Sequence, residues 1–455
     1  MNDASQPQLQ PQAQSQSQPS ILFASPMNVL DITSGASLSM RTLLAALAAR
    51  GFRAVALQAT LFDSTHGGEH VLHAGEEHKD KKLLRAQVLG VEHLIVRTQA
   101  ARRDLMTCGE QEIYLRRFRE ELRDRRPDMI ILWGGLLLEM TVMREAREAG
   151  IPVVFYLVNS GYRFKETFKY VSVIVTDTQA TADMYQERHG FTCHPIGKFI
   201  DVSLIKAAER KPGFITFINP SFEKGVNVFM PLARLAAREC PEIKFLVVES
   251  RGRWGNALKA FKFPPRDFPN VKIIGHQRDM RPVYGNTRAV LLPSTWYESG
   301  ARVIAESLLN GIPVLASNTG GSSELVGKGG VMFDLPEVVR EKKMIAAGEE
   351  VVRPWLEEIK RIVHDEAHYR QLCRHAEKEA EQHDIQHNTD RLLQAVMPVV
   401  QASKARTPSP RPAPSSPTPA PLASSSLPSA DGKSVLKKAL EKKQAKQARR
   451  QGRAR

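Results

Sequence analysis

Cysteine is scarce in this sequence, with four residues in 455, namely Cys108, Cys193, Cys240 and Cys373. They lie far apart and form no C-x-x-C pair, whereas disulfide frameworks and zinc sites use cysteines at short or regular spacings. Histidines and carboxylates likewise form no cluster with the spacing of metal ligands. We therefore expect reduced thiols in a cytoplasmic protein, with no disulfide framework, no metal site and no other cofactor.

Long apolar runs are also missing from the sequence. The longest candidate, near 129–138, is too short for a membrane-spanning helix, which needs about 20 apolar residues, and we interpret it as a buried strand and turn. Residues 1–19 are rich in Gln, Ser and Pro and lack the basic start and apolar centre of a signal peptide. We expect this segment to be disordered and the protein to stay in the cytoplasm.

Positive charge is concentrated at one end of the chain. Residues 401–455 hold 13 Lys and Arg against Asp431 and Glu441, so they carry +11 of the net +15 and the rest is nearly balanced. The segment is rich in Pro, Ser and Ala up to Ala430, which predicts a disordered basic tail. The tail would increase solubility, or it would be in peripheral contact with an anionic membrane that bears a lipid-linked acceptor. Nucleic acid is the least favoured partner of the tail.

The remaining chain shows the pattern of α/β domains. Its length allows more than one domain, and 42% hydrophobic residues are ample for buried sheets. A small-residue loop over 31–39 precedes a helical pattern over 40–50. Short apolar runs alternate with such patterns, which is typical of doubly wound parallel sheets. The expected strands are 21–23, 54–57, 129–133, 153–158, 171–176, 243–248, 271–275 and 289–292.

Two carboxylates, Glu298 and Glu306, lie eight positions apart across a turn that follows the apolar run 289–292. A strand, a short polar turn over 299–301 and a helix present backbone N–H groups to a phosphate. A helix that begins near Gly300 places Glu306 about two turns along it and Glu298 in front of its N-terminus. One carboxylate would then hold a ribose hydroxyl pair while the other faces a sugar, with amides between them meeting a diphosphate.

This stretch resembles the E-x7-E signature of the retaining glycosyltransferases of family 4, which are two-domain GT-B enzymes that transfer a sugar from a nucleotide diphosphate. In that family the first Glu is followed by x-F-G, and here Gly300 and Ala301 occupy the Phe and Gly positions. Ala301 therefore adds a methyl group where the backbone approaches the phosphate most closely.

A second stretch, 214–225, is similar to the first strand and loop of the family's second domain, where an Arg and a Lys five residues later bind the diphosphate. Lys224 matches the Lys, but Asn219 replaces the Arg and offers one amide instead of a fork of charged donors. Arg251 and Arg302 are the candidates to supply the missing charge. The resemblance assigns catalysis to Glu298 and Lys224, and donor binding to Asn219, Gly225, Arg251, Gly275, Ser299, Gly300, Ala301, Arg302 and Glu306.

The family's first domain contributes a glycine-containing loop that faces the diphosphate and the acceptor, and here it corresponds to Ser34, Gly35 and Ala36. Many members carry a His after the strand that matches 153–158, where this chain has Asn159. An amide cannot take up a proton, so the resemblance implies transfer on one face of the sugar, with the leaving phosphate accepting the acceptor's proton.

The resemblance covers most of the chain and implies an α/β GT-B fold, with two Rossmann-like doubly wound domains facing a central cleft. We expect an acceptor domain over 20–205, a nucleotide-sugar domain over 206–374 and a closing helix over 375–400 that ends at Pro398 and packs back on the first domain.

The implied function is that of a retaining, metal-independent, hexosyltransferase-like enzyme with a nucleotide-diphosphate sugar as donor and an unidentified glycan, lipid-linked or small-molecule acceptor. The alternative is a catalytically impaired GT-B-like nucleotide-sugar-binding protein, which Asn219 and Asn159 favour. A phosphorylase or an epimerase would share the fold but matches this signature less readily.

Overall fold

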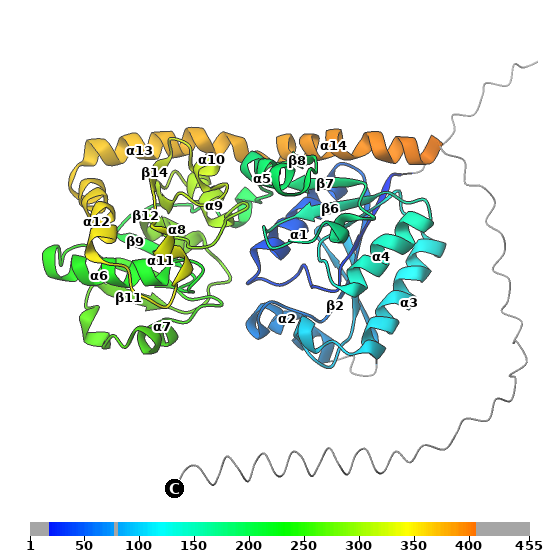
Figure 1. Cartoon of the computed structure of the whole chain (residues 1–455), viewed down its shortest axis with the longest axis horizontal. Helices are drawn as coiled ribbons and strands as arrows, with labels where there is room; N and C mark the ends of the chain where they lie inside the picture. The colour runs from blue at the N-terminus through cyan, green and yellow to red at the C-terminus, as the bar shows by residue number, and fades with distance from the viewer. Residues whose placement is uncertain (1–17, 77–80, 406–455) are drawn as a thin grey trace, which may run out of the picture. The chain divides into compact units, whose positions relative to one another are not determined.

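The computed structural model describes residues 18–76 and 81–405, and in this part of the chain two α/β domains follow one another (Figure 1). The strands of the first domain form one sheet in the order β3-β4-β2-β1-β5-β6-β7-β8. The β3–β4 pair is antiparallel and the other neighbours are parallel. The elements are β1 (Ser20–Ala24), α1 (Gly35–Ala49), β2 (Arg53–Ala59), α2 (Thr65–Glu76), β3 (Leu83–Val88), β4 (Val91–Val96), η1 (Arg103–Leu105), α3 (Cys108–Asp124), β5 (Met129–Leu132), α4 (Leu137–Glu148), β6 (Val153–Leu157), η2 (Lys165–Phe168), β7 (Val173–Thr176), α5 (Gln179–His189), β8 (Cys193–Pro195) and η3 (Val202–Leu204), where η marks a 3-10 helix.

The second domain holds a six-stranded parallel sheet in the order β11-β10-β9-β12-β13-β14. Its elements are β9 (Phe214–Ile218), α6 (Val226–Glu239), β10 (Phe245–Val248), α7 (Trp254–Phe261), η4 (Pro265–Asp267), β11 (Val271–Ile274), α8 (Arg281–Asn286), β12 (Thr287–Leu292), α9 (Arg302–Leu309), β13 (Val314–Ser317), α10 (Ser322–Val326), β14 (Gly330–Phe333), α11 (Glu337–Glu341), α12 (Glu349–His364) and α13 (Glu366–Glu379). The chain then continues through η5 (Ala380–His383) to α14 (Ile385–Ala405), which returns to the first domain.

The predicted doubly wound architecture is confirmed, and each expected apolar run overlaps a strand. β5 and β6 are buried along their whole length, because helices cover both faces of the sheet. Parallel pairing sets the carboxyl ends of neighbouring strands side by side, and these ends carry the loops in which the sequence places its candidate site.

The helix expected over 40–50 begins earlier, at Gly35. The prediction of a loop over 31–39 was therefore wrong for residues 35–39, which are helical. Ser34 caps this helix, since its hydroxyl accepts a hydrogen bond from the Ser37 amide at 3.4 Å. Ser37 and Ser39 are buried within the first turns. Their small side chains allow the first turns of the helix to pack closely. The same small residues are common in loops, and this is why the sequence pattern suggested a loop here.

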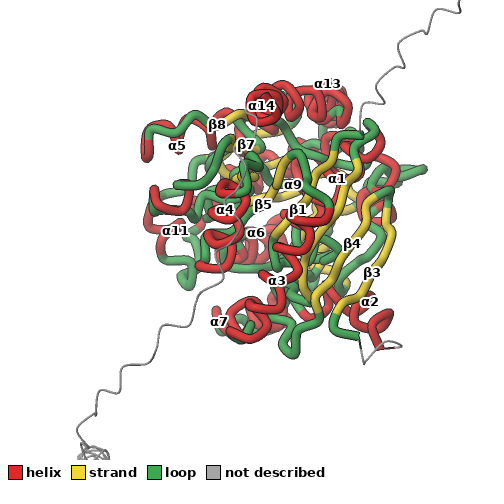
Figure 2. Tube along the Cα trace, turned by 90° about the vertical axis from the view of Figure 1, so that its right-hand side faces the viewer, coloured by secondary structure: helices red, strands yellow, loops and turns green. Residues whose placement is uncertain are grey.

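The hairpin of β3 and β4 was not identified from the sequence. Figure 2 shows it at the edge of the first sheet, beside α2. Its turn places Leu89 at φ 51° and Gly90 at φ 77°. β3 mixes apolar, charged and half-exposed residues because it lies at the sheet edge, and such a strand carries little periodic signal.

The closing helix predicted over 375–400 is instead divided among α13, η5 and α14, and it does not end at Pro398. Pro398 lies inside α14 on its exposed side, where water can reach the Gln394 carbonyl that loses its helical donor. Val396 and Val400, on the opposite side, are buried against the first domain. Residues 401–405 therefore belong to the folded body. Apart from residues 18–19, the other residues that were predicted to be disordered lie outside the described part of the chain.

Within these same described residues, none of the helices has the length and apolarity that a membrane span requires.

Candidate active site

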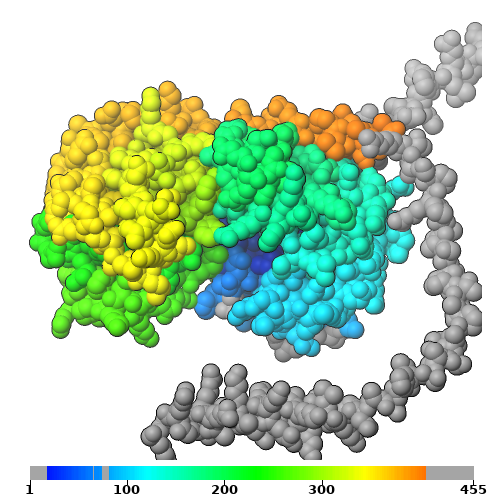
Figure 3. All heavy atoms as spheres, viewed as in Figure 1, coloured from blue at the N-terminus to red at the C-terminus, as the bar shows by residue number. Residues whose placement is uncertain are grey.

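A central cleft of about 810 Å³ lies between the two domains, where the carboxyl ends of both parallel sheets meet. Figure 3 shows the hollow, with blue atoms of the N-terminal segment inside it. The loops after β1, β5 and β6 line one side, and those after β9, β10, β11 and β12 line the other. The predicted site residues in its lining are Ser34, Gly35, Ala36, Asn159, Asn219, Lys224, Arg251, Glu298, Gly300, Ala301, Arg302 and Glu306. Gly225, Gly275 and Ser299 do not line it.

Glu298 and Lys224 form an ion pair in this cleft. Lys224 Nζ donates to Glu298 Oε1 at 2.6 Å, and the Ser294 hydroxyl donates to the same oxygen at 2.6 Å. The Glu298 side chain is 7% exposed and that of Lys224 is 24% exposed, so the cation is the more accessible partner. Charge-assisted hydrogen bonds of this kind hold a carboxylate in one orientation.

Gly225 has a backbone role next to this pair. Its φ is 80°, and a Cβ there would lie 1.7 Å from the Pro293 carbonyl oxygen. The loop that carries Lys224 can therefore lie directly against the loop that carries Glu298 only because residue 225 has no side chain.

Glu306 is engaged through both carboxylate oxygens. Oε1 accepts from Arg302 Nε at 2.5 Å and Oε2 accepts from the Tyr284 hydroxyl at 2.5 Å. Burial, together with the charge of Glu306, raises the pKa of Tyr284 well above its ordinary value, so this hydroxyl stays a donor. Arg302 also donates to the Phe199 carbonyl at 2.9 Å, which links Glu306 to the segment that joins the two domains.

Asn219 serves the loop geometry. It has φ 62°, a left-handed conformation that Asn tolerates better than most residues, and its Oδ1 accepts from the Gly252 amide at 2.7 Å. This contact holds the loop of Arg251, whose Nη1 lies 3.5 Å from Asp63 Oδ2 of the first domain. Arg251 is thus the cation that reaches across the cleft at the level of the β9 and β10 loops.

Two helix N-termini face each other in the cleft. A Cβ at Gly35, the first residue of α1, would lie 4.0 Å from Arg302 Cβ at the start of α9. The cap residue of α9, Ala301, offers no side-chain hydrogen bond to the first turn. Free N–H groups and the positive ends of both helices therefore favour an anion between them.

The first domain also holds the signature loop itself, through residues that sequence reasoning missed. Thr178 Oγ1 donates to the Ser299 carbonyl at 2.7 Å, and a Cβ at Gly300 would lie 2.4 Å from Asp177 Cβ. Asp177 is buried and accepts from Lys198 Nζ at 2.6 Å and from the Tyr156 hydroxyl at 2.5 Å. No spacing rule connects residues from three separate segments, so the sequence offered no signal for this cluster.

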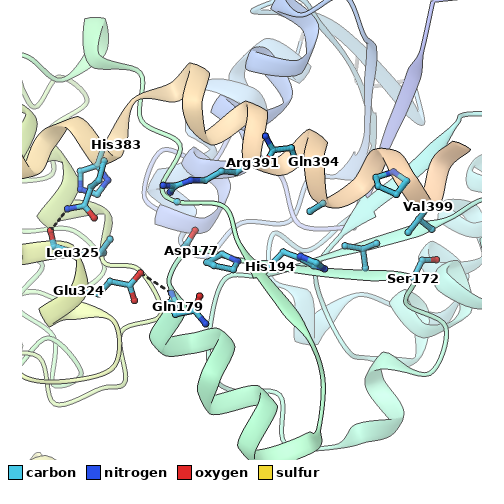
Figure 4. A pocket seen from close by; sticks show the side chains of 16 residues that line it. Ser172, Asp177, Gln179, His194, Glu324, Leu325, His383, Arg391, Gln394 and Val399 are labelled. Carbon is cyan, nitrogen blue, oxygen red and sulfur yellow. Dashed lines mark hydrogen bonds between the residues drawn. The ribbon is translucent and has the colours of Figure 1, made fainter.

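A second cross-domain contact involves Glu324 of α10. Its two oxygens accept from the Gln179 and Ala180 amides at 2.9 Å each, so a carboxylate of the second domain caps α5 of the first. Figure 4 shows the Glu324–Gln179 hydrogen bond at the edge of another cavity, of about 790 Å³, under α14. None of the predicted site residues lines that cavity, which leaves the central cleft as the candidate active site.

Within residues 18–76 and 81–405, no group of three or more His, Cys, Asp or Glu residues is arranged to hold a metal ion.

Known proteins resemble both the fold and one part of the sequence. Residues 211–364, about a third of the chain, match the family model described as glycosyl transferases group 1, and this segment includes Lys224, Glu298 and Glu306. A search of the curated proteins finds no match.

Similar solved structures include sucrose-phosphate synthase from Thermosynechococcus elongatus, with 15% identity and a TM-score of 0.63 over 85% of this chain and 100% of that one. Anabaena HepE in complex with UDP and glucose has 16% identity and a TM-score of 0.59 over 84% and 99% of the two chains. A glycosyltransferase from Rickettsia africae has 12% identity and a TM-score of 0.60 over 86% and 100%. These likenesses confirm the GT-B fold, while the assignment to family 4 stays a prediction.

Proposed function

We propose that this protein is a retaining, metal-independent glycosyltransferase that moves a sugar from a nucleotide diphosphate to an acceptor bound by the first domain. The observation that carries the proposal is the Lys224–Glu298 pair at 2.6 Å, set in a cleft between two facing helix N-termini. The match of residues 211–364 to a glycosyltransferase family supports it.

The diphosphate would meet Lys224, Arg251 and the first amides of α9. These groups are positioned before the reaction, and they would stabilise the negative charge that develops on the leaving diphosphate. Glu298, 7% exposed and held by Ser294, would face the sugar and stabilise its oxocarbenium-like state.

Proton transfer would involve the donor itself. The bond between the sugar's anomeric carbon and the phosphate oxygen breaks, the acceptor oxygen bonds to that carbon on the same face, and the acceptor's proton goes to the leaving phosphate. Asn159, whose Oδ1 accepts from the Gly161 amide at 2.8 Å, cannot act as the base.

The nucleoside would bind beside Glu306. Each oxygen of this carboxylate accepts one hydrogen bond and keeps a further lone pair, which a ribose hydroxyl could use. Since the HepE structure contains UDP, uridine diphosphate sugars are the first donors to test.

The test is donor hydrolysis and transfer by the pure protein over a panel of nucleotide sugars, with two variants. Glu298→Gln should lower turnover and leave the donor Kd nearly unchanged. Glu306→Ala should weaken donor binding by about 1.5–3 kcal/mol, roughly 10- to 100-fold, since a charge-assisted hydrogen bond to ribose is lost.

Glu187→Gln is the matched control, because Glu187 is exposed on α5 and away from the cleft. Loss of turnover in Glu306→Ala with unchanged donor affinity would contradict the assignment of that carboxylate. Nucleotide-sugar binding without hydrolysis or transfer to any acceptor would favour a non-catalytic binding protein.

A further inference from the structure

Four large apolar side chains are exposed on neighbouring segments of the first domain, at the end of η1, at the start of α4 and just before η2. Their exposed fractions are 55% for Leu105, 57% for Leu136, 79% for Leu137 and 73% for Phe164. We call these four residues the rim patch. Single exposed apolar side chains are ordinary, but a group of them on one part of a surface indicates an interaction site.

Contacts between the loops bring the rim patch together. A Cβ at Gly135 would lie 2.8 Å from Thr167 Cγ2, so the loop of Leu136 and Leu137 lies against the loop of Phe164. Arg103 Nη2 bonds Glu139 Oε1 at 3.1 Å, which fixes η1, with Leu105, to the start of α4.

The same loops form the acceptor side of the central cleft. Trp133 and Asn159, which line the cleft, lie only a few positions before Leu136 and Phe164 respectively. The rim patch therefore lies beside the entrance that an acceptor would use.

Positive charge flanks Phe164. Arg163 and Lys165 flank Phe164 and are exposed, and Arg163 makes no hydrogen bond or ion pair with the described residues. Two nearby acids are already neutralised, because Asp104 pairs with Arg102 at 2.6 Å and Glu139 pairs with Arg103. Glu166 is the exposed acid that remains, so the loop 163–166 keeps a net positive charge.

The second domain has a similar feature on its side of the cleft. Trp296 lines the cleft and is 41% exposed, and Lys343 Nζ lies 5.2 Å from its ring centre. Met344 and Ile345 follow at 59% and 58% exposure. Aromatic and aliphatic side chains next to lysines recur on both sides of the cleft.

We propose that the rim patch docks on an anionic phospholipid bilayer. Phe164 and Leu137 enter the interfacial region, while Arg163 and Lys165 contact the lipid phosphates. Exposed apolar side chains near cations, as at Phe164, suit the boundary between acyl chains and headgroups. A protein partner would instead need a packed area of about 800 Å² on each side.

The docking also suggests the acceptor class. If the proposed glycosyl transfer is correct, an entrance next to the bilayer favours an amphiphilic, lipid-linked acceptor over a small soluble one. This consequence rests on the proposed function, whereas the docking itself does not.

The test is co-sedimentation of the full chain with phosphatidylcholine vesicles that contain or lack phosphatidylglycerol, at low and high salt. Leu137→Ser and Phe164→Ser should each lower the partition coefficient about tenfold, because each removes one large apolar side chain that the bilayer would bury. This loss should persist at high salt, where the contribution of the basic segment 406–455 is screened. Arg163→Gln with Lys165→Gln should weaken binding to the anionic vesicles only.

Leu89→Ser is the matched control, since Leu89 is 52% exposed on the β3–β4 turn, and equal thermal unfolding would show that all variants fold. Wild-type binding by Leu137→Ser and Phe164→Ser would overturn the proposal. The proposal would also be overturned if the wild-type protein self-associates in sedimentation velocity while the two variants lose that self-association and keep their vesicle binding. Vesicle binding without donor hydrolysis or sugar transfer would refute the proposed function and leave the docking intact.

Discussion

Lys224 has two partners in the proposed mechanism, Glu298 and the diphosphate. The 2.6 Å hydrogen bond to a carboxylate that is 7% exposed holds the ammonium at the cleft surface, and its own 24% exposure leaves it accessible to a ligand. A cation that is already oriented loses less entropy when it binds an anion.

We predict that Lys224→Ala reduces affinity for the nucleotide diphosphate about 10- to 100-fold and changes affinity for the nucleoside little, since only the diphosphate carries the charge that Lys224 meets. Titration calorimetry with both ligands measures the difference. Lys259→Ala, an exposed lysine of α7, is the control. If both ligands weaken alike in Lys224→Ala, the lysine has a structural role.

Most of the residues that the sequence proposed for the site line the cleft, but their hydrogen-bond partners were not foreseen. The resemblance assigned both Lys224 and Glu298 to catalysis, and their side chains form a hydrogen-bonded pair. The engagement of Glu306 by Tyr284 could not be foreseen, because it depends on where α8 packs. Asn219 was interpreted only as a replacement for the family's arginine, because the sequence does not show that its backbone has a left-handed φ.

At the scale of elements, uninterrupted apolar runs gave the clearest strand predictions. β5 and β6 are short uninterrupted apolar runs with helices on either side, and such runs were recognised. β3, half exposed at the sheet edge, was not. The end of α14 was predicted wrongly because local proline chemistry suggested a stop, while packing of Val396 and Val400 continues the helix.

The last turn of α14 gives a prediction about the domain boundary. The Ser403 hydroxyl donates to the Gly150 carbonyl at 2.5 Å, and Lys404 Nζ lies 2.7 Å from Asp128 Oδ1. Burial alone would raise the pKa of Asp128, but hydrogen bonds from Lys404 and Ser20 hold it below its ordinary value.

We predict that ending the chain after Val400 lowers the free energy of unfolding by about 1–2 kcal/mol, because one hydrogen bond and one half-exposed ion pair are lost. Ending it after Ala405 should change the melting temperature and donor hydrolysis little. Chemical denaturation of the two truncated proteins checks this. Equal stability would show that residues 401–405 do not belong to the folded body.

At the scale of the whole molecule, the first domain contributes to the geometry of the second. The Ser299 carbonyl accepts from Thr178, and Glu324 caps α5 in return, so the loop with Glu298 depends on both domains. Gly300 permits this approach because a side chain there would collide with Asp177. The proposed catalytic carboxylate is therefore coupled to the relative position of the domains.

Two buried histidines predict how the stability of the molecule depends on pH. His93 lies in β4 of the first sheet and His383 at the end of η5, just before α14. Burial, assisted by Arg41 and Lys198 respectively, lowers the pKa of each to about 4. Above the unfolded pKa of about 6.5 both states are neutral. Between these values the unfolded chain binds more protons, so stability must fall as pH decreases.

We expect each histidine to cost about 2 kcal/mol of unfolding free energy between pH 7 and pH 5. His383→Met should reduce that loss by about the share of one histidine, because neither ring nitrogen of His383 has a hydrogen-bond partner and the variant does not titrate. Denaturant unfolding across this pH range measures the slope, and His387→Met, at an exposed position of α14, is the control. A His383→Met protein with the wild-type slope would show that His383 is charged or hydrated in the folded state, and the destabilisation at low pH would then have to come from other groups.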